Sequence, residues 1–312
     1  MRNITLKQLR LVRAAHEKGS YAAAAEATHV TPPAVTMQIK ALEEEIGLPV
    51  FERDGPRLVP TAAGQELIDA ARRIDAVLTD ARESLEAMRR IEGGRVTVGV
   101  VSTAKYFAPR MLAAFARLHP KVELNLVVGN RSDVLGRFLA GEFDVAIMGR
   151  PPEDAPVEST SIGPHPHVVV AAIDDPAVQD DEITPAQLAD RVFLVREPGS
   201  GTRNLMEGFL AKVGIHPPIG MEIGSNETIK QAVIAGLGLT FISAHTVAAE
   251  IEDHRLVLLD VEGLPLWRRW YVCRLARKRA MPAVRLLADF LLQEGESFLP
   301  KAPGVPERPD RA

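Results

Sequence analysis

The chain has 312 residues, of which 46% are hydrophobic and 25% charged, and its formal net charge is −4. This length predicts two or three domains with ordinary globular cores. The slightly acidic balance excludes a protein that binds nucleic acid through bulk positive charge. Residues 1–60 carry eight Lys and Arg against seven Asp and Glu, a net charge of +1. Any DNA contact there depends on where the charges lie.

Cys273 is the single cysteine, which excludes a disulfide within the chain and a cysteine zinc site. The first residues lack the apolar core of a secretion signal, and the chain has no run of about 18 apolar residues. We therefore expect a cytosolic protein without membrane contact. Residues 298–312 are rich in proline and charge, which predicts a disordered tail.

Residues 1–61 have the pattern of a winged helix-turn-helix domain. A first helix ends at Gly19, a short Ala-rich helix covers residues 21–27, and a third helix ends at Gly47. Two short segments around Asp54, Gly55 and Pro56 then predict a hairpin.

Pro32 and Pro33 stand where the third helix begins. The first four amides of a helix have no partner within it, so proline loses nothing there. A sharp start after a tight turn is typical of the helix that enters the major groove, although a plain three-helix bundle is the alternative. The residues that we expect near DNA are Ser20, Tyr21, Thr31, Pro33, Ala34, Thr36, Met37, Lys40, Arg53 and Thr61.

Residues 62–92 are predicted to form a long linker helix. Its apolar residues alternate by four and three over three heptads, which is the pattern of a coiled-coil interface. A helix lying on its own domain is the alternative. We favour a dimerisation helix because no apolar element near it in sequence covers these positions. The expected interface residues are Leu67, Ile74, Leu78 and Leu85.

Residues 93–297 alternate between apolar strands and helices, which predicts an α/β domain with parallel sheets and helices on both faces. The pattern breaks near Gly163 and Pro164. We therefore expect two lobes with a cleft between them, lobe I at about 95–163 and 268–297 and lobe II at about 164–267. The chain is expected to cross back near Trp267.

Polar residues gather where the predicted strands end, and ligands of open α/β sheets bind outside those ends. Gly199 and Gly201 allow backbone amides to converge on an anion ahead of a helix, and Arg131 and Arg203 are suited to phosphate or carboxylate oxygens. A Gly-rich turn with solvated arginines is the alternative. The predicted effector-binding residues are Ser102, Thr103, Asn130, Arg131, Gly149, Glu197, Gly199, Ser200, Gly201, Thr202, Arg203, Ser225 and Asn226.

No catalytic or metal site is expected. The P-loop, a complete dinucleotide motif and the G-x-S-x-G turn are all absent from the sequence. Ser243 and His245 lack an acid to orient the histidine, so Ser243 is expected to start a helix. His165 and His167 supply only two ligands, and Cys273 is expected to be buried and inert. The basic segment 267–279 fits a lobe strand with an outward basic face better than a DNA-binding segment.

The first 64 residues resemble the LysR-type transcriptional regulators. The matching segments are residues 5–9, 20–25, 33–39, 42–43, 47, 50–53 and 58–64. The family usually has glutamine, a base-reading side chain, where this chain has Pro32. Base readout is therefore expected to shift to Thr36, Met37 and Arg53 and to DNA shape.

Segments between residues 95 and 275, among them VGVVSTAKYFAP, FDVAIMGRPPED, GPHPHVVVA and FLVREPGSGTRN, resemble the regulators of Calvin-cycle (RubisCO) operons in autotrophic bacteria. The resemblance implies an effector domain of periplasmic-binding-protein type in an activator that assembles as a dimer of dimers. It implies operator DNA and RNA polymerase as partners. The implied effector is ribulose bisphosphate, phosphoglycolate or another sugar phosphate, or NADPH, and no other cofactor is expected.

Three alternatives stay open at this point. They are a regulator of another operon that senses a different small anion, a cytosolic solute-binding protein of the same two-lobed fold, and an enzyme that acts on phosphate esters. The predicted winged domain argues against the second, and the lack of a paired base or nucleophile argues against the third.

Overall fold

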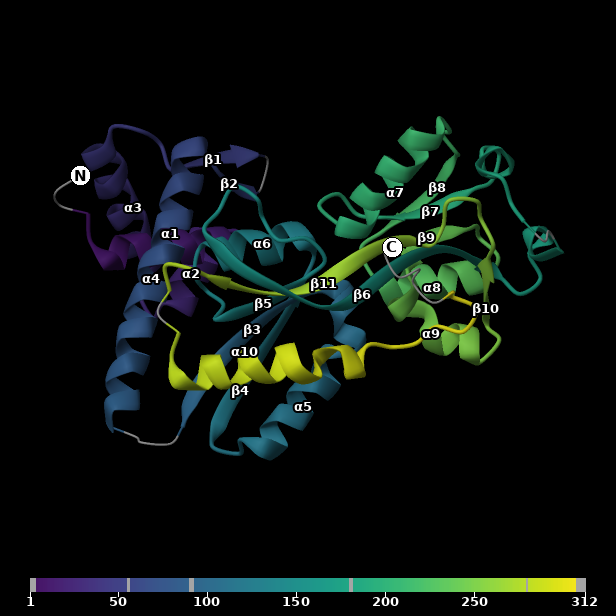
Figure 1. Cartoon of the computed structure of the whole chain (residues 1–312). Coiled ribbons are helices and arrows are strands. Elements are labelled where there is room, and N and C mark those ends of the chain that lie inside the picture. Colours follow the sequence, from purple (N-terminus) through teal and green to yellow (C-terminus); the bar gives the residue numbers. More distant parts are fainter. Residues whose placement is uncertain (1–3, 55–56, 90–92, 180–181, 279, 307–312) are drawn as a thin grey trace. The chain divides into compact units, whose positions relative to one another are not determined.

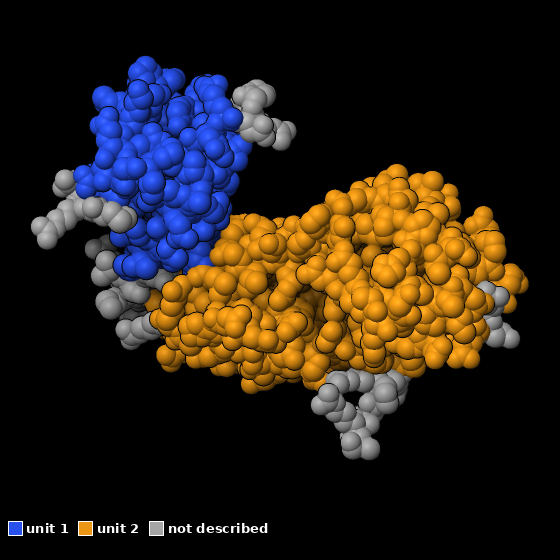
Figure 2. Space-filling view, turned by 90° about the horizontal axis from the view of Figure 1, so that it is seen from above, with its two compact units in different colours: residues 1–88, 140–142 blue, residues 89–139, 143–312 orange. Residues whose placement is uncertain are grey.

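The computed structural model describes residues 4–54, 57–89, 93–179, 182–278 and 280–306. The chain forms two compact units (Figures 1 and 2), residues 1–88 with 140–142 and residues 89–139 with 143–312. None of the helices in the described ranges combines the length and the apolar character needed to cross a bilayer.

Unit 1 contains the predicted helix-turn-helix and hairpin. Its elements are α1 (Leu6–Lys18), α2 (Tyr21–Ala27), α3 (Pro32–Ile46), β1 (Phe51–Asp54), β2 (Arg57–Pro60) and α4 (Ala62–Arg89). The two strands pair antiparallel, with Phe51 opposite Pro60 and Arg53 opposite Leu58. The tip of the hairpin, residues 55 and 56, lies outside the described residues.

The ends of α3 follow from its sequence. Pro32 and Pro33 occupy the first two helical positions, after Thr31 at the N-cap. At the other end Gly47 adopts a left-handed φ of 72°, which closes the helix at little steric cost. Glu43 of the acidic triplet has a local role, because its carboxylate accepts a hydrogen bond from the Val50 amide at 2.8 Å. That bond ties the helix end to the start of the hairpin.

The first half of α4 belongs to the core of its own unit. Leu67 is 7% exposed and Ala71 2%, and both lie in one apolar cluster with α1 and α3, against which Ile74 packs in part. The expectation that no nearby element covers the heptad positions is therefore wrong for Leu67. Leu78 is 42% exposed, so a free apolar surface begins about there. The side chain of Leu85 lies outside the described residues.

Unit 2 is built on a seven-stranded mixed sheet in the order β10-β6-β11-β5-β3-β4, with β9 also paired to β6, and on a separate parallel pair β7-β8. The strands are β3 (Gly94–Val101), β4 (Val122–Gly129), β5 (Val145–Met148), β6 (Val157–Ala172), β7 (Phe193–Arg196), β8 (Ile219–Ile223), β9 (Thr240–Ser243), β10 (Leu256–Leu259) and β11 (Leu266–Leu275). The α-helices are α5 (Ala108–Leu118), α6 (Arg131–Leu139), α7 (Gly201–Val213), α8 (Asn226–Ile234), α9 (Ala244–Glu252) and α10 (Pro282–Glu294). Short 3-10 turns are η1 (Ser102–Tyr106), η2 (Pro176–Gln179), η3 (Pro185–Leu188) and η4 (Gly295–Phe298).

Two long antiparallel strands, β6 and β11, run through both lobes (Figure 1), with pairing from His167–Leu266 to Val157–Leu275. The chain thus crosses back near Trp267 as predicted. The strand β6 continues through Gly163 and Pro164, so no loop separates the lobes at the predicted boundary. Gly163 has a φ of 143° beside a bulge in β6, where the pairing with β11 skips Ile162, and a Cβ on Gly163 would lie 2.6 Å from the Leu299 side chain. This glycine marks a close approach inside a strand rather than its end.

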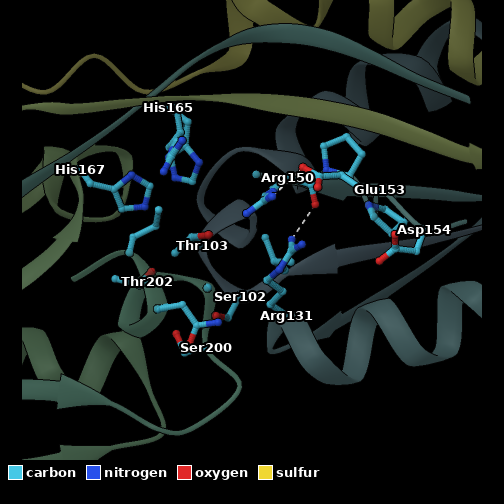
Figure 3. A pocket seen from close by; sticks show the side chains of 18 residues that line it. Ser102, Thr103, Arg131, Arg150, Glu153, Asp154, His165, His167, Ser200 and Thr202 are labelled. Atoms are coloured by element: carbon cyan, nitrogen blue, oxygen red, sulfur yellow. Dashed lines mark hydrogen bonds and ion pairs between the residues drawn. The ribbon is translucent and has the colours of Figure 1, made fainter. Parts of the chain in front are cut away.

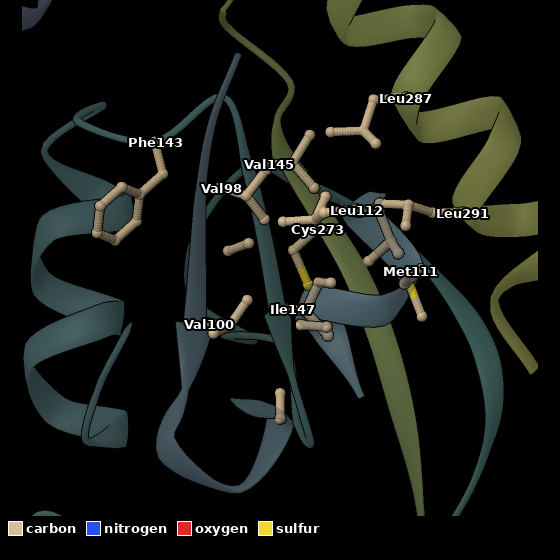
Figure 4. Close-up of a cluster of buried hydrophobic side chains, with 14 of the residues drawn as sticks. Val98, Val100, Met111, Leu112, Phe143, Val145, Ile147, Cys273, Leu287 and Leu291 are labelled. Carbon is tan, nitrogen blue, oxygen red and sulfur yellow. The ribbon is translucent and has the colours of Figure 1, made fainter. Parts of the chain in front are cut away.

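Each lobe has its own core. In lobe I, β3, β5 and β11 contribute Val98, Ile147 and Cys273, which α10 covers with Leu287 and Leu291 (Figure 4). Burial raises the pKa of the Cys273 thiol to about 12, as expected for an inert cysteine. Lobe II has two apolar clusters, one around Phe209 and Phe241 and the other around Ile229 and Val247.

The C-terminal segment is ordered further than predicted. Leu299 packs in part against the lobe I core, whereas Ala302 and Val305 pack in part against a lobe II cluster. The predicted disorder is therefore wrong for residues 298–306, because apolar side chains among the prolines pack against the cores of both lobes. Residues 307–312 lie outside the described residues.

Candidate functional sites

The outer face of α3 is available to a partner. Val35, Ile39 and Leu42 are buried, which leaves the opposite side of the helix exposed. A shallow hollow on that side is lined by Pro33, Thr36, Met37 and Lys40 with three neighbours, and Met37 is 61% exposed. Thr31 is exposed and Ala34 half-buried beside them. The residues predicted to face DNA on α3 thus share one surface.

Three of the other four residues predicted near DNA have roles within unit 1. The Ser20 hydroxyl accepts a hydrogen bond from the Ala23 amide and so caps α2. The Thr61 hydroxyl donates to the Pro49 carbonyl at 2.6 Å and accepts from the Gly64 amide. Tyr21 is half-buried, edge-on to Phe51 at 6.0 Å between ring centroids. Arg53 of the wing is exposed. Contact of these four residues with DNA stays a prediction.

A cavity of about 380 Å³ lies between the two lobes of unit 2 (Figure 3). Lobe I contributes Ser102 and Thr103 from η1 and Arg131 from the start of α6. Lobe II contributes Ser200 and Thr202 around the start of α7. The sequence predicted these residues, together with Gly149 and Gly201, and the structure brings them together. Hydroxyls from both lobes therefore face one space, as a ligand-binding cleft requires.

One end of the cavity holds two arginines. The Arg131 guanidinium donates to the Arg150 carbonyl at 2.7 Å. Burial, followed by the positive charge of Arg150, lowers the pKa of Arg131. Arg150 itself pairs with Glu153 at 2.6 Å on the outer rim, and Asp154 lies beside them. A partly buried cation next to a like charge is stabilised by a bound anion, so this end suits a phosphate or carboxylate.

Histidines line the other end (Figure 3). His165 and His167 project from β6 into the cavity, and both are buried, at 4% and 1% exposure. The His165 ring stacks on Trp270 at 3.8 Å, and its Nε2 lies 3.0 Å from the Ser243 hydroxyl. Burial lowers the pKa of His165 far below its usual value and that of His167 to about 3, so both rings are neutral near pH 7.

Six predicted effector residues do not line the cavity. Their side chains or backbone instead form caps, turns and hydrogen bonds in the elements around it. Asn130 accepts from the Asp133 amide at the start of α6, and Ser225 caps α8. Glu197 and Asn226 bond the buried Arg196, and Gly199 forms a turn with a φ of 82°. Arg203 pairs with Glu207 at 2.8 Å and Glu222 at 2.5 Å and lies outside the cavity lining, so this structure does not place it as the predicted anion clamp.

Sequence reasoning missed Arg150, His165, His167 and Arg268 as cavity residues. The sequence shows the alternation of His165 and His167, but by itself this pattern indicates only an incomplete metal site. Arg268 lies on β11, which returns from far along the chain, so nothing local in the sequence could place it beside β6. The pairing of His165 with Ser243, which does start α9, was likewise invisible.

A polar bridge beside the cavity joins the lobes. The Tyr106 hydroxyl of η1 donates to Glu227 of α8 at 2.5 Å, and Lys105 lies 3.5 Å from the same carboxylate. Lys230 stands over the Tyr106 ring at 4.7 Å. Arg196 of lobe II also donates to the Ser102 hydroxyl at 3.4 Å. These contacts favour the relative orientation of the lobes seen here.

Comparison with known proteins gives the family. Residues 6–65 match the model of the bacterial regulatory helix-turn-helix protein, lysR family, and residues 89–296 match the LysR substrate binding domain. The chain is 57% identical over 302 residues to the HTH-type transcriptional regulator CbbR of Xanthobacter flavus, covering 96% of this chain and 91% of that protein. It is 41% identical over 292 residues to the RuBisCO operon transcriptional regulator of Allochromatium vinosum, with 94% and 97% covered.

Among solved structures, the regulatory domain of Synechocystis PCC6803 CcmR in complex with 2-PG (2-phosphoglycolate) is 35% identical, with a TM-score of 0.62. The match covers 65% of this chain and 97% of that one. The two family models together span both the winged unit and the two-lobed unit. This chain belongs to the LysR family of transcriptional regulators.

Proposed function

We propose that this protein regulates transcription of Calvin-cycle (RubisCO) operons as an activator, under the control of a small phosphorylated metabolite or NADPH. The observation that carries the assignment is the 57% identity to a CbbR regulator along 96% of the chain. At that level the similarity includes the cavity as well as the winged unit. The second relative, a RuBisCO operon regulator, supports the same operon class.

The DNA-binding step is assigned to α3 and the wing. In a helix-turn-helix protein the recognition helix lies in the major groove and two-fold related copies read two half-sites. The exposed side of α3, with Thr36, Met37 and Lys40, is the surface of unit 1 that fits this role. Dimerisation through the exposed part of α4, assembly into a dimer of dimers, and contact with RNA polymerase complete the proposal.

The effector is assigned to the cavity between the lobes. Its arginine end and its hydroxyls fit a phosphate group, and a similar domain, that of CcmR, binds 2-phosphoglycolate. A ligand changes the DNA complex only if it binds one orientation of the lobes more tightly than another. Because residues of both lobes line the cavity, a bridging ligand has this property.

The test is a gel shift and a DNase footprint on promoter DNA taken upstream of a RubisCO operon. The full chain should bind this DNA more tightly than a shuffled sequence of the same length. 2-Phosphoglycolate, ribulose bisphosphate or NADPH should change the footprint or the affinity. Equal binding to promoter and shuffled DNA would overturn the operon assignment. A footprint unchanged by all three compounds would overturn the effector class.

A further inference from the structure

The histidine end of the cavity carries polar atoms without partners. The Nδ1 atoms of His165 and His167 are buried and have no hydrogen-bond partner among the described residues. Both residues line the cavity, so these atoms are available to a bound molecule. Buried polar atoms of native proteins nearly always have a partner, and an unpaired one marks a place where a ligand or water belongs.

The hydrogen bond of His165 settles which kind of atom faces the cavity. The Ser243 side chain is fully buried, and its hydroxyl has His165 Nε2 as its partner in the described structure. A buried hydroxyl that donates its proton to Nε2 is satisfied, whereas one that only accepts leaves its own proton unpaired. Nε2 is therefore the acceptor, and in the neutral ring Nδ1 carries the proton. His165 thus offers an N–H donor to the cavity.

The charges near His165 and His167 favour an anion at the histidine end of the cavity. Arg268 lines the same cavity, and its positive charge is one of the causes that lower the pKa of His167, after burial. Among the described residues, His245 is the other titratable group that lowers the pKa of both histidines, and its ring lies 5.9 Å from that of His165. The carboxylates of the cavity, Glu153 and Asp154, lie at the arginine end (Figure 3). No described carboxylate of the cavity neutralises the histidine end.

We propose that His165 and His167 form a second acidic-group subsite, which receives a carboxylate or phosphate of the effector and takes up a proton when the effector binds. The effector then carries an acidic group at each end, one held near Arg131 and the other at the histidines. This inference rests on the proposed function, since it concerns the ligand of the same cavity. It adds that affinity depends on pH through the protein's own histidines.

The proton uptake follows from electrostatics. Both rings are neutral because burial disfavours their charged forms, and neighbouring groups add to that effect, His245 for both rings and Arg268 for His167. An oxyanion within hydrogen-bond distance reverses it, because an opposite charge favours the imidazolium. Since Nδ1 of His165 already carries a proton, the added proton goes to its Nε2, and the Ser243 hydroxyl then turns to accept from that N–H. The Trp270 ring, stacked on His165 at 3.8 Å, is placed to stabilise that cation further. A group whose pKa rises on binding makes the ligand bind more tightly as pH falls.

The experiment is isothermal titration of the full chain between about pH 7 and about pH 8.5, where a phosphate ester is already a dianion with its second pKa near 6. 2-Phosphoglycolate, ribulose bisphosphate and NADPH are the probes, and inorganic phosphate is the one-ended control. Two buffers of different ionisation enthalpy report the protons taken up. A two-ended probe should bind with proton uptake and lose up to about tenfold in affinity per pH unit, whereas inorganic phosphate should show neither effect.

Two variants test the residues. His165→Phe should weaken binding by about tenfold or more at pH 7 and remove most of the proton uptake. His165→Asn keeps an N–H near the Nδ1 position, so it should recover part of the affinity but none of the uptake. This split separates ligand contact from a general loss of structure.

A glycine offers a matched pair that leaves the histidines intact. A Cβ on Gly149 would lie 3.2 Å from His165 Nδ1, so Gly149→Ala should obstruct the subsite and weaken binding of the two-ended probe. Gly208→Ala, where a Cβ meets nothing within 4 Å, should not. Unchanged affinity and proton uptake in His165→Phe, with binding lost in Arg131→Ala, would overturn the subsite and leave the proposed function standing. No binding by any two-ended probe would contradict both the subsite and the effector class.

Discussion

Arg131 and Arg203 have the same sequence context, since each follows a predicted strand end and lies at a helix start, but their surroundings differ. Arg131 lines the cavity beside Arg150. Arg203 is held by Glu207, Glu222 and the Arg196 carbonyl. The two carboxylates that satisfy Arg203 come from its own helix and from β8, and only the fold brings the latter close.

Arg131→Ala should therefore raise the dissociation constant of the effector by about ten- to a hundredfold, because a charge-assisted hydrogen bond contributes about 1.5–3 kcal/mol. Arg203→Ala, the matched control, should leave it within about twofold. Titration of both variants with 2-phosphoglycolate decides the matter. A larger loss in Arg203→Ala would mean that the cavity changes its lining when the ligand binds.

The buried histidines make stability depend on pH in a defined direction. Burial lowers the pKa of His167 to about 3 and that of His245 to about 4. In the unfolded chain each titrates near its usual value of about 6.5. The unfolded state therefore binds more protons below that pH, so stability is full above about pH 6.5 and is lost as pH falls toward 4 and 3.

Unfolding by urea should show unit 2 less stable at about pH 5.5 than at about pH 7.5, by about 1 kcal/mol for each such histidine. His167→Phe should remove the part of this pH dependence that comes from His167. Phenylalanine should fit there, because the His167 ring already stacks on Phe241 at 5.6 Å. His216→Ala, at an exposed position, is the control and should leave the dependence intact. A pH profile of His167→Phe identical to that of the wild type would contradict the assignment.

Helix starts and stops were predicted correctly because they depend on residues that are neighbours in the sequence. The helix starts at Ser20 and Pro32 and the stops at Gly19 and Gly47 appear in the structure where the sequence placed them. The course of β6 did not follow, because Gly163 and Pro164 have the composition of a turn. The same holds for the residues that line the cavity. Residues at strand ends were found, whereas those from β6 and β11 depend on a pairing between distant segments.

The helix α4 changes its role along its length. Its first turns complete the core of unit 1, and exposed apolar residues begin at Val77 and Leu78, which are 65% and 42% exposed. Leu67→Ala should destabilise unit 1 by about 2–4 kcal/mol through a core cavity. Replacing both Val77 and Leu78 with Glu should leave the fold intact but give monomers in sedimentation. Dimers that persist in the double variant would place the main interface elsewhere.

The hairpin that follows α3 places Arg53 outward while Phe51 is buried at 8% exposure. Arg53→Ala should weaken operator binding by about 1–3 kcal/mol if the arginine reads a base. A phosphate contact would instead weaken all sequences alike and reduce the salt dependence. Gel shifts at several salt concentrations, with operator and shuffled DNA, separate these outcomes. Affinity equal to wild type in every condition would remove Arg53 from the interface.

On the scale of the whole effector unit, Tyr106 connects the lobes. Burial alone would raise the pKa of Glu227, but hydrogen bonds from Tyr106 and Lys230 lower it overall, so the carboxylate stays charged at neutral pH. Tyr106→Phe should lower effector affinity by about two- to tenfold, because closure loses one hydrogen bond of about 0.5–1.5 kcal/mol. Tyr271→Phe is the control, and calorimetry with small-angle scattering provides the readout. Unchanged affinity and unchanged scattering would show that the bridge does not set the relative orientation of the lobes.

The order in which segments leave the ribosome has a consequence for this topology. Unit 1 takes its core from the first 74 residues, so it has every part it needs early in synthesis. Lobe I is different, because β11 separates β6 from β5 in the sheet and arrives only at residues 266–275. A nascent chain stopped just before β11 would expose the facing edges of two apolar strands, which is the condition for aggregation. Early termination should therefore yield insoluble protein, even though the DNA-reading unit is complete.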